Sequence, residues 1–330
     1  MRVLCSGSYL ADILVPGLPR IGPPGSLTYA PMGIHLSPGG HSANVALDLA
    51  QLGQRDVHST GCLGDDAMGE YLTRELARAG VHAYPQVAEG VPTAKNVALI
   101  VEGEDRRFIA ELTANTLLEP RHVTGLVERL RPAVLYQGTV GGLRYIDAQL
   151  SAVLGHARRH GAATLVDAIP PTGGWGHVEE AYPHVDVLHL NLQEARQLTG
   201  REPLGGVLDR LAESHVPLTV VSDGERGLYA VAGGGRLRMP AFKVSAVDQT
   251  GAGDALCAGI IDSLSRHGLD PLRLGEAPMD VLARVLMEAQ AAGAACVTGV
   301  GATTNVRVGL TEALIREQGE AVLEAVEAAE

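Results

Sequence analysis

Lysine is almost absent from this chain, since only Lys95 and Lys243 occur among its 330 residues. Neither lysine follows the G-x-x-x-x-G spacing that a phosphate-binding P-loop requires. The formal net charge is -12, whereas a protein that binds nucleic acid needs a basic face. The sequence therefore excludes a P-loop nucleotide site and argues against nucleic acid as a partner.

Cysteines and large aromatic residues are also few. The four cysteines lie far apart without a C-x-x-C pair, at Cys5, Cys62, Cys257 and Cys296. Cysteines scattered among apolar residues are typical of buried free thiols and of a reducing compartment, so we expect a cytoplasmic protein. With two phenylalanines and one tryptophan, the core must be aliphatic. The first residues show no signal-peptide pattern and no apolar run is long enough to span a bilayer, so we expect no membrane partner.

Short apolar runs alternate with helical patterns along most of the chain. Strands are predicted at residues 2–6, 57–61, 133–137, 163–166, 185–190, 218–221 and 227–231. Helices are predicted at residues 43–52, 68–79, 145–160, 192–198, 204–214, 255–266, 279–295 and 310–328. This alternation is typical of βαβ units and predicts an α/β fold with a mostly parallel sheet covered on both faces. The length suits one large domain over residues 1–330.

Two regions interrupt the alternation. Residues 12–36 are rich in proline and glycine and too numerous for an ordinary loop, and residues 93–112 contain two predicted strands around a turn. Together they can form a small β lid over the carboxyl edge of the sheet, where a lid suits a ligand site that excludes water. Two unrelated surface insertions are the alternative. An exposed lid edge also invites pairing with a second copy, so we expect a homodimer through the lid.

The most informative motif is Asp-Gln-Thr-Gly-Ala-Gly-Asp at residues 248–254. Its small residues, 251–253, follow a β-type run at 241–244 and open an apolar helical pattern. The unpaired N–H groups of a first helical turn, together with the helix dipole, favour an anion at that place. A carboxylate beside such an anion hole, here Asp254, is suited to removing a proton from a hydroxyl while the hole holds a phosphoryl group.

A second glycine motif opens another predicted helix. Gly39 and Gly40 allow the backbone to approach a ligand closely, and Asn44 offers both a donor and an acceptor. A glycine pair alone is usually a turn. Asp12, however, also follows a strand-like run, and a carboxylate with an amide is what recognition of a polyol needs.

Two further motifs stand at junctions between predicted strands and the segments that follow them. Asn191 and Glu194 can orient water on Mg²⁺ near phosphates, or they can simply cap a helix through a capping box. Ser222, Gly224 and Gly227 can form an ordinary turn, or they can supply N–H and hydroxyl groups to a nucleotide. The local sequence suggests no Ser/His/Asp or Cys/His set.

Together these motifs resemble those of the ribokinase-like sugar kinases, the phosphofructokinase-B family. The resemblance covers nearly the whole chain in the right order, and it rests on Gly39-Gly40-x-x-x-Asn44, Gly61-x-x-Gly64-x-Asp66-x-x-Gly69, Asn191-x-x-Glu194, Ser222-x-Gly224-x-x-Gly227 and residues 248–254. The last motif is highly specific in this context and the others support it. The resemblance implies a three-layer α/β/α sandwich with a β lid, and transfer of the γ-phosphate of ATP to an alcohol.

The resemblance also implies roles for individual residues. Asp254 matches the base, and the anion hole matches the amides of Gly251, Ala252 and Gly253. The positions that hold substrate hydroxyls correspond to Asp12, Gly39, Gly40 and Asn44. The nucleotide and Mg²⁺ side corresponds to Asn191, Glu194, Ser222, Gly224 and Gly227, with Glu194 acting on Mg²⁺ through water. A monovalent cation, K⁺, would bind main-chain oxygens of Asp248, Thr250, Cys296, Gly299 and Gly301, with Asn305 nearby.

The chain departs from ribokinase itself at several positions. His41-Ser42 stands where many members carry Lys-Gly, and Leu10 replaces an asparagine that contacts sugar. Residues 111–115 lack the usual His-x-Gly-Ala-Asn form, and the strand end at 136–138 lacks a glutamate. These departures put ribose in doubt and leave the kinase chemistry untouched.

We therefore expect a kinase for a free sugar or polyol. A nucleoside kinase of the same family is the first alternative, although few aromatic residues are available to stack on a base. A sugar phosphate is less favoured, because His41 is not a permanent cation. A catalytically silent sugar-binding protein is the last alternative, and it has no need of Asp254. Arg106 and Arg107 in the lid are candidates for phosphate contact, but a solvated turn explains them better.

Overall fold

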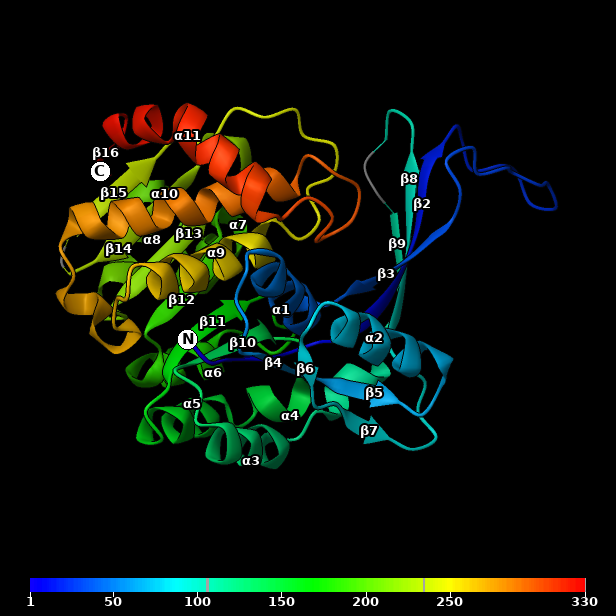
Figure 1. Ribbon diagram of the computed structural model, residues 1–330, viewed down its shortest axis with the longest axis horizontal. Coiled ribbons are helices and arrows are strands. Elements are labelled where there is room, and N and C mark those ends of the chain that lie inside the picture. The colour runs from blue at the N-terminus through cyan, green and yellow to red at the C-terminus, as the bar shows by residue number, and fades with distance from the viewer. Residues whose placement is uncertain (105–106, 234, 330) are drawn as a thin grey trace.

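The computed structural model of the protein describes residues 1–104, 107–233 and 235–329. Within these residues, a ten-stranded sheet has the strand order β16-β15-β14-β13-β12-β11-β10-β1-β4-β6 (Figure 1). Its strands are β1 (Val3–Ser6), β4 (Val57–Thr60), β6 (His82–Ala83), β10 (Val134–Val140), β11 (Ala163–Ala168), β12 (Val187–Asn191), β13 (Leu218–Ser222), β14 (Leu228–Ala232), β15 (Gly235–Met239) and β16 (Glu327–Ala328). Pairing is parallel from β6 to β13 and antiparallel from β13 to β16, which confirms the predicted mostly parallel sheet.

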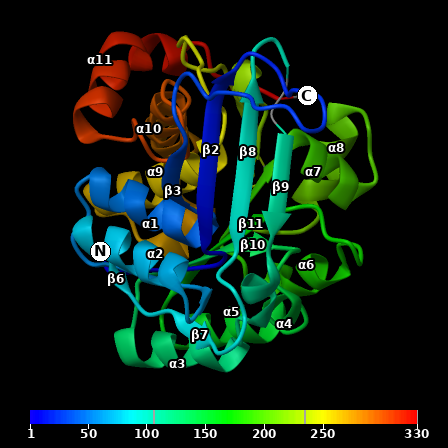
Figure 2. The ribbon, with the colours of Figure 1, turned by 90° about the vertical axis from the view of Figure 1, so that its right-hand side faces the viewer.

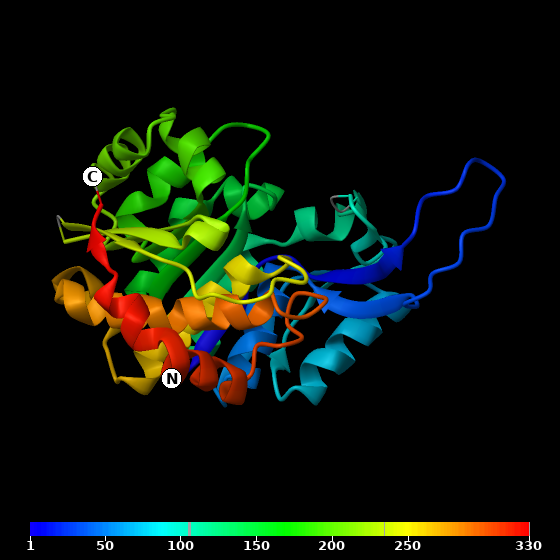
Figure 3. The same cartoon turned by 90° about the horizontal axis from the view of Figure 1, so that it is seen from above.

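Helices cover both faces of this sheet, as Figures 1 and 3 show. One layer holds α1 (His41–Gln51), α2 (Ala67–Arg78), α9 (Ala252–Arg266), α10 (Met279–Cys296) and α11 (Val308–Glu324). The other layer holds α3 (Pro120–Leu130), α4 (Arg144–Asp147), α5 (Leu150–Arg159), α6 (Gly176–Ala181), α7 (Leu192–Thr199) and α8 (Leu204–Ala212). Short 3-10 helices occur at η1 (Thr113–Leu117), η2 (Tyr182–His184), η3 (Gly224–Arg226) and η4 (Pro271–Glu276).

Alternating side chains of the central strands fill two separate aliphatic cores. In β10, Val134 and Tyr136 pack into one core and Leu135 into the other, so every residue of this strand is buried. Successive side chains of a strand point to opposite faces, which is why a sheet covered on both sides needs apolar residues throughout. The four cysteines are buried free thiols, as predicted.

The two regions that interrupt the alternation meet in a separate four-stranded sheet, and Figure 2 shows its strands side by side. Its order is β3 (His35–Gly39), β2 (Leu10–Leu18), β8 (Lys95–Val101) and β9 (Arg107–Glu111). We call this four-stranded sheet the lid. A third, two-stranded sheet pairs β5 (Cys62–Gly64) with β7 (Gln86–Ala88). The lid stands beside the α/β/α sandwich, as expected (Figure 1).

Four local predictions were wrong. Residues 241–244 form no strand, and the chain there runs without regular structure toward α9. The predicted helix 145–160 is interrupted, because Gln149 has non-helical torsion angles (φ -132°, ψ 22°) between α4 and α5. The last helix ends at Glu324, because β16 leaves it to pair with β15 at the sheet edge. Asp12 lies inside β2, since its backbone pairs with β3 and β8.

A helix that crosses a membrane must be both long and apolar. No helix in the described part of the chain meets both conditions.

Candidate active site

The amino terminus of α9 has the form predicted for an anion hole. The helix begins at Ala252, earlier than the predicted start at residue 255. Gly251 is the N-cap, with φ 81°, and no side chain caps the helix. A Cβ atom on Gly251 would lie 2.4 Å from the main-chain oxygen of Ala302, so the backbone fits only without a side chain. Ala252 and Gly253 line an adjacent cavity. The amides of the first turn are thus placed to meet an anion there.

The adjacent cavity has a volume of about 460 Å³. Among the residues that line it are Asn191, Ser222, Gly224, Gly227, Ala252 and Gly253. These residues come from three separate sequence motifs, so the fold brings Asn191, Ser222, Gly224 and Gly227 to the start of α9, whereas Glu194 is not among the residues that line the cavity. A volume of this size is typical of small-molecule sites.

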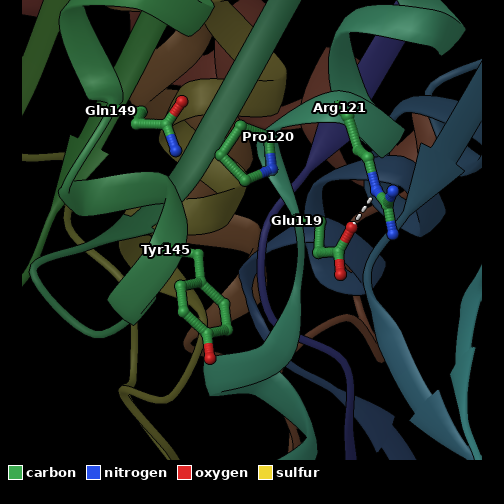
Figure 4. A pocket seen from close by; sticks show the side chains of 5 residues that line it. All are labelled: Glu119, Pro120, Arg121, Tyr145 and Gln149. Carbon is green, nitrogen blue, oxygen red and sulfur yellow. Dashed lines mark hydrogen bonds and ion pairs between the residues drawn. The ribbon is translucent and has the colours of Figure 1, made fainter.

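Another hollow, of about 310 Å³, lies apart from these motifs (Figure 4). It is lined by Glu119, Pro120, Arg121, Tyr145 and Gln149. Within it, Arg121 is paired with Glu119, and none of the predicted site residues contributes. The first cavity is therefore the one that the sequence motifs identify.

Asp254 is buried in the first turn of α9 and contacts three polar side chains. Its Oδ2 accepts a hydrogen bond from Asn44 Nδ2 at 2.9 Å. Its Oδ1 lies 3.4 Å from the hydroxyl of Tyr136 and 3.9 Å from Nε2 of His41. Burial raises the pKa of Asp254 to about 6, against the lowering effect of His41. A carboxylate with such a pKa is suited to act as a general base near neutral pH.

The predicted substrate residues lie on the lid strands β2 and β3 and at the start of α1. Asp12 Oδ1 accepts from Asn96 Nδ2 at 3.1 Å, and burial raises the pKa of Asp12 to about 6. A Cβ on Gly39 would lie 1.9 Å from Oδ2 of Asp12, so glycine gives that carboxylate its room. Gly40, with φ 90°, is the N-cap of α1, and Asn44 in that helix reaches the base.

Asn191 and Glu194 form the capping box that the sequence allowed as an alternative. Asn191 Oδ1 accepts from the N–H of Glu194 at 2.9 Å, and Glu194 Oε2 accepts from the N–H of Asn191 at 2.7 Å. Both interactions stabilise the start of α7. Burial raises the pKa of Glu194, and the nearby charge of Asp167 raises it further. A helix cap thus also places a second carboxylate beside the site.

The predicted cation site consists of two segments, a first loop at residues 248–250 and a second loop at residues 296–305. Asp248 connects the two. Its Oδ1 accepts from the N–H of Thr250 at 3.0 Å, and its Oδ2 accepts from the N–H of Gly301 at 3.0 Å. The Cys296 thiol donates to the main-chain oxygens of Thr250 at 3.3 Å and Ala302 at 3.0 Å.

The remaining predicted members of the cation site lie in the second loop. The N–H of Gly299 donates to the main-chain oxygen of Cys296 at 3.3 Å. Asn305 Nδ2 donates to Thr298 at 2.8 Å. The main-chain oxygens of Thr250 and Ala302 therefore lie beside the start of α9.

Sequence reasoning missed two buried polar residues at the site, Asp167 and His189. His189 Nδ1 lies 2.8 Å from Asp167 Oδ1, and Tyr136 donates to Asp167 Oδ2 at 3.0 Å. His189 Nε2 lies 3.2 Å from Ser222 Oγ, so Ser, His and Asp side chains do come together, contrary to the local sequence. The sequence feature that could have indicated these two residues is a charged or polar side chain near the end of an otherwise apolar strand.

Gln290 of α10 is a further residue that the sequence did not single out. It lines the nucleotide-side cavity, and neither of its side-chain polar atoms has a hydrogen-bond partner within the described residues. A buried amide without a partner costs free energy, so it is suited to a ligand that supplies one. A glutamine in the middle of a helix has no sequence feature that marks it as a site residue.

Of the two lid arginines, only Arg107 can be compared with the prediction. Arg107 is exposed and pairs with Glu104, which agrees with a solvated turn. Arg106 lies outside the described residues.

A buried carboxylate beside a helix amino terminus without a side-chain cap, on a mostly parallel sheet with a lid, is the arrangement expected of a phosphotransferase of the α/β class. The model of the pfkB family of carbohydrate kinases matches residues 4–308, and the chain belongs to that family. It is thus a carbohydrate kinase, as the sequence motifs predicted.

Individual relatives agree with this assignment. The chain is 29% identical over 290 residues to a fructokinase of Klebsiella pneumoniae, covering 81% of this chain and 88% of the relative. It is 27% identical over 279 residues to an aminoimidazole riboside kinase of Salmonella typhimurium, covering 81% of this chain and 84% of the relative. The crystal structure of a fructokinase with bound ATP from Xylella fastidiosa superposes with a TM-score of 0.80 at 24% identity, covering 96% of this chain and 99% of that one. The last likeness supports the fold.

Proposed function

We propose that this protein transfers the γ-phosphate of ATP to a hydroxyl group of a free sugar or polyol. One observation carries the proposal. Asp254 contacts Asn44 on the lid side of the site, while the helix turn that holds it borders the cavity of Asn191 and Ser222 on the other side. A base between an acceptor site and a nucleotide cavity has the arrangement that phosphoryl transfer needs.

The residues divide the reaction between them. Asp12, Gly39, Gly40 and Asn44 bind and orient the acceptor, and Asp254 takes the proton of the hydroxyl as its oxygen attacks the γ-phosphorus. The bond between the γ-phosphorus and the β–γ bridging oxygen breaks, and ADP leaves with that oxygen. The amides of residues 251–253 stabilise the negative charge of the transferring group.

The nucleotide side is assigned to Asn191, Ser222, Gly224 and Gly227. When bound, Mg²⁺ neutralises charge on the β- and γ-phosphates. Glu194 fits such an ion, because its buried carboxylate with a raised pKa gains from a nearby cation. We assign Glu194 to hold Mg²⁺ through water.

A nucleoside kinase is the second candidate, because one relative is an aminoimidazole riboside kinase. A base usually stacks on an aromatic ring. Tyr9 is fully buried and its hydroxyl donates to Ser59, and the buried Tyr136 is held between Asp167 and Asp254. Among the aromatic residues predicted near the site, this leaves only Tyr29 and Phe108 of the lid region exposed to a ligand. The geometry favours a sugar.

An ATP-consumption screen over ketoses, aldoses, polyols and nucleosides tests this proposal. Turnover with a free sugar or polyol is the expected result. Turnover with nucleosides alone would replace the sugar by the second candidate. ATP binding by calorimetry without turnover on any acceptor would identify the silent sugar-binding alternative.

Potassium is expected to activate the enzyme. Main-chain oxygens of Asp248, Thr250, Cys296, Gly299 and Gly301, with Asn305 nearby, are the ligands we assign to it. A cation there would stiffen the loops next to Gly251 and so the anion hole. Initial rates should rise several-fold when KCl replaces NaCl or tetramethylammonium chloride at equal ionic strength. Equal rates in all three salts would remove K⁺ from the assignment.

We also propose a homodimer through the lid. The lid strands and the segment between β2 and β3 expose large apolar side chains: Ile21, Leu27, Tyr29, Met32, Ile34, Leu36, Phe108 and Ile109. Figure 3 shows this segment reaching away from the sandwich, where a second copy can cover it. Exposed apolar patches of this kind mark interaction surfaces. Sedimentation velocity should give a dimer that Ile34→Glu with Ile109→Glu converts to monomer. A monomeric wild type would contradict the proposal.

The four buried free thiols support a cytoplasmic location. Reducing compartments keep such thiols unpaired. Fractionation of the source cell with immunodetection tests this assignment, and recovery outside the cytoplasm would contradict it.

A further inference from the structure

Asp167, His189 and Ser222 lie on three neighbouring strands and form a continuous hydrogen-bonded series. Asp167 Oδ1 lies 2.8 Å from His189 Nδ1, and His189 Nε2 lies 3.2 Å from Ser222 Oγ. Asp167 and His189 are buried, whereas Ser222 lines the cavity of about 460 Å³. A buried carboxylate and imidazole therefore support one hydroxyl in the wall of that cavity.

The imidazole of His189 is fixed in place from three sides. Both ring nitrogens take part in hydrogen bonds, so rotation of the ring would break two of them. A Cβ on Gly253 would lie 3.0 Å from Cε1 of His189, which places the ring directly against the anion-hole turn. The pair thus holds Ser222 at a set position relative to Gly253.

The carboxylate of Asp167 sets the orientation of the His189 ring. Asp167 Oδ1 lies beside Nδ1, which turns Nε2 toward Ser222 Oγ. The hydroxyl of Ser222 is thereby held in the wall of the cavity.

We propose that His189 is a positioning residue of the nucleotide site, which holds the hydroxyl of Ser222 at a set position for contact with the phosphate groups of ATP. This inference rests on the proposed function, which places the nucleotide in that cavity. Hydrogen bonds to charged phosphate oxygens are stronger than those between neutral groups, so the orientation of one hydroxyl affects binding of ATP.

A double-mutant cycle tests the inference. Ser222→Ala, His189→Leu and the double variant are compared with wild type by KM for ATP, KM for the acceptor, kcat, and ATP binding by calorimetry. His189→Gln keeps a side-chain amide that can donate to Ser222, and His189→Ala takes the place of the leucine variant if that one fails to fold. His58→Leu is the matched control, because His58 is also buried and lies 2.7 Å from a carboxylate oxygen of Asp56.

We expect each single variant to raise KM for ATP about tenfold, with the acceptor KM unchanged. The double variant should be no worse than either single one, because both remove the same contact. His189→Gln should recover most of the affinity, and His58→Leu should lower only the thermal stability.

Additive effects, or an unchanged KM for ATP in His189→Leu and in His189→Gln, would overturn the role of His189 alone. Wild-type protein that neither binds nor consumes ATP would overturn the proposed function as well. The two failures are therefore distinguishable.

Discussion

Replacement of Asp254 by asparagine should lower kcat by about 10²- to 10⁴-fold, the usual contribution of a general base. Asparagine keeps an oxygen that accepts from Asn44 at the position where Asp254 Oδ2 accepts at 2.9 Å, so the local fold should persist. The amides of residues 251–253 remain, and ATP should bind as before. Steady-state rates and calorimetric ATP binding on one preparation check both halves of the expectation.

The pH dependence of the wild-type enzyme reports the same carboxyl group. Burial raises the pKa of Asp254 from 3.8 to about 6, so the group loses its proton only above that pH. The base must be deprotonated to accept a proton, and kcat/KM should therefore fall as pH decreases through about 6. Below the pKa the fall should approach tenfold per pH unit. The part of the acidic limb that is due to Asp254 should be absent from the residual activity of Asp254→Asn, whereas a part due to Asp12, whose pKa burial also raises to about 6, should remain.

Asp262→Asn provides the matched control, because Asp262 is an equally buried aspartate in the same helix, bound to Gln54 and Arg266. This change should lower the melting temperature and leave kcat near the wild-type value. Near-full turnover in Asp254→Asn, or an equal loss in both variants, would contradict the role of Asp254 as base.

The features that the sequence predicts well are contiguous ones. The proposed base and anion hole both lie within residues 248–254, so their spacing alone indicates the chemistry. Gly39, Gly40 and Asn44 likewise occupy the end of β3 and the first turn of α1. Local geometry determines how such groups sit relative to each other, and it requires no knowledge of the sheet order.

Asp167 and His189 could not be found in this way. They belong to different strands and meet Ser222 only because β11, β12 and β13 are adjacent in the sheet. Gln290 reaches the same cavity from α10, which is far from those strands in sequence. The order of parallel strands is a property of the whole fold, and side chains that depend on it appear only in the structure.

The boundaries of the lid strands β2 and β3 were similarly out of reach. Asp12 was placed after a strand, whereas its backbone pairs on both sides within the lid. Proline and glycine in β2 and β3 hide the period of two that marks a strand. The two strands within residues 93–112 were predicted and form β8 and β9, but the pairing of β2 with β3 and β8 was not predicted.

Gly251→Ala should lower kcat by about 10²- to 10³-fold, the loss seen when one donor of an oxyanion hole is removed. Gly251 has φ 81°, and a Cβ there would lie 2.4 Å from the main-chain oxygen of Ala302. The backbone at Gly251 and the backbone at Ala302 cannot move apart without turning the first amides of α9 away from the cavity. The loss should appear in kcat, measured by steady-state kinetics at saturating ATP.

Gly268→Ala separates this effect from backbone strain. Gly268 follows the other end of α9 with φ 62°, and a Cβ there would meet no atom within 4 Å. Alanine in the left-handed region costs about 1 kcal/mol of stability at either position. Both variants should therefore melt earlier, but only Gly251→Ala should lose turnover. Equal kcat values in the two variants would mean that the transferring phosphoryl group does not lie against the first turn of α9, because that turn could then move without consequence.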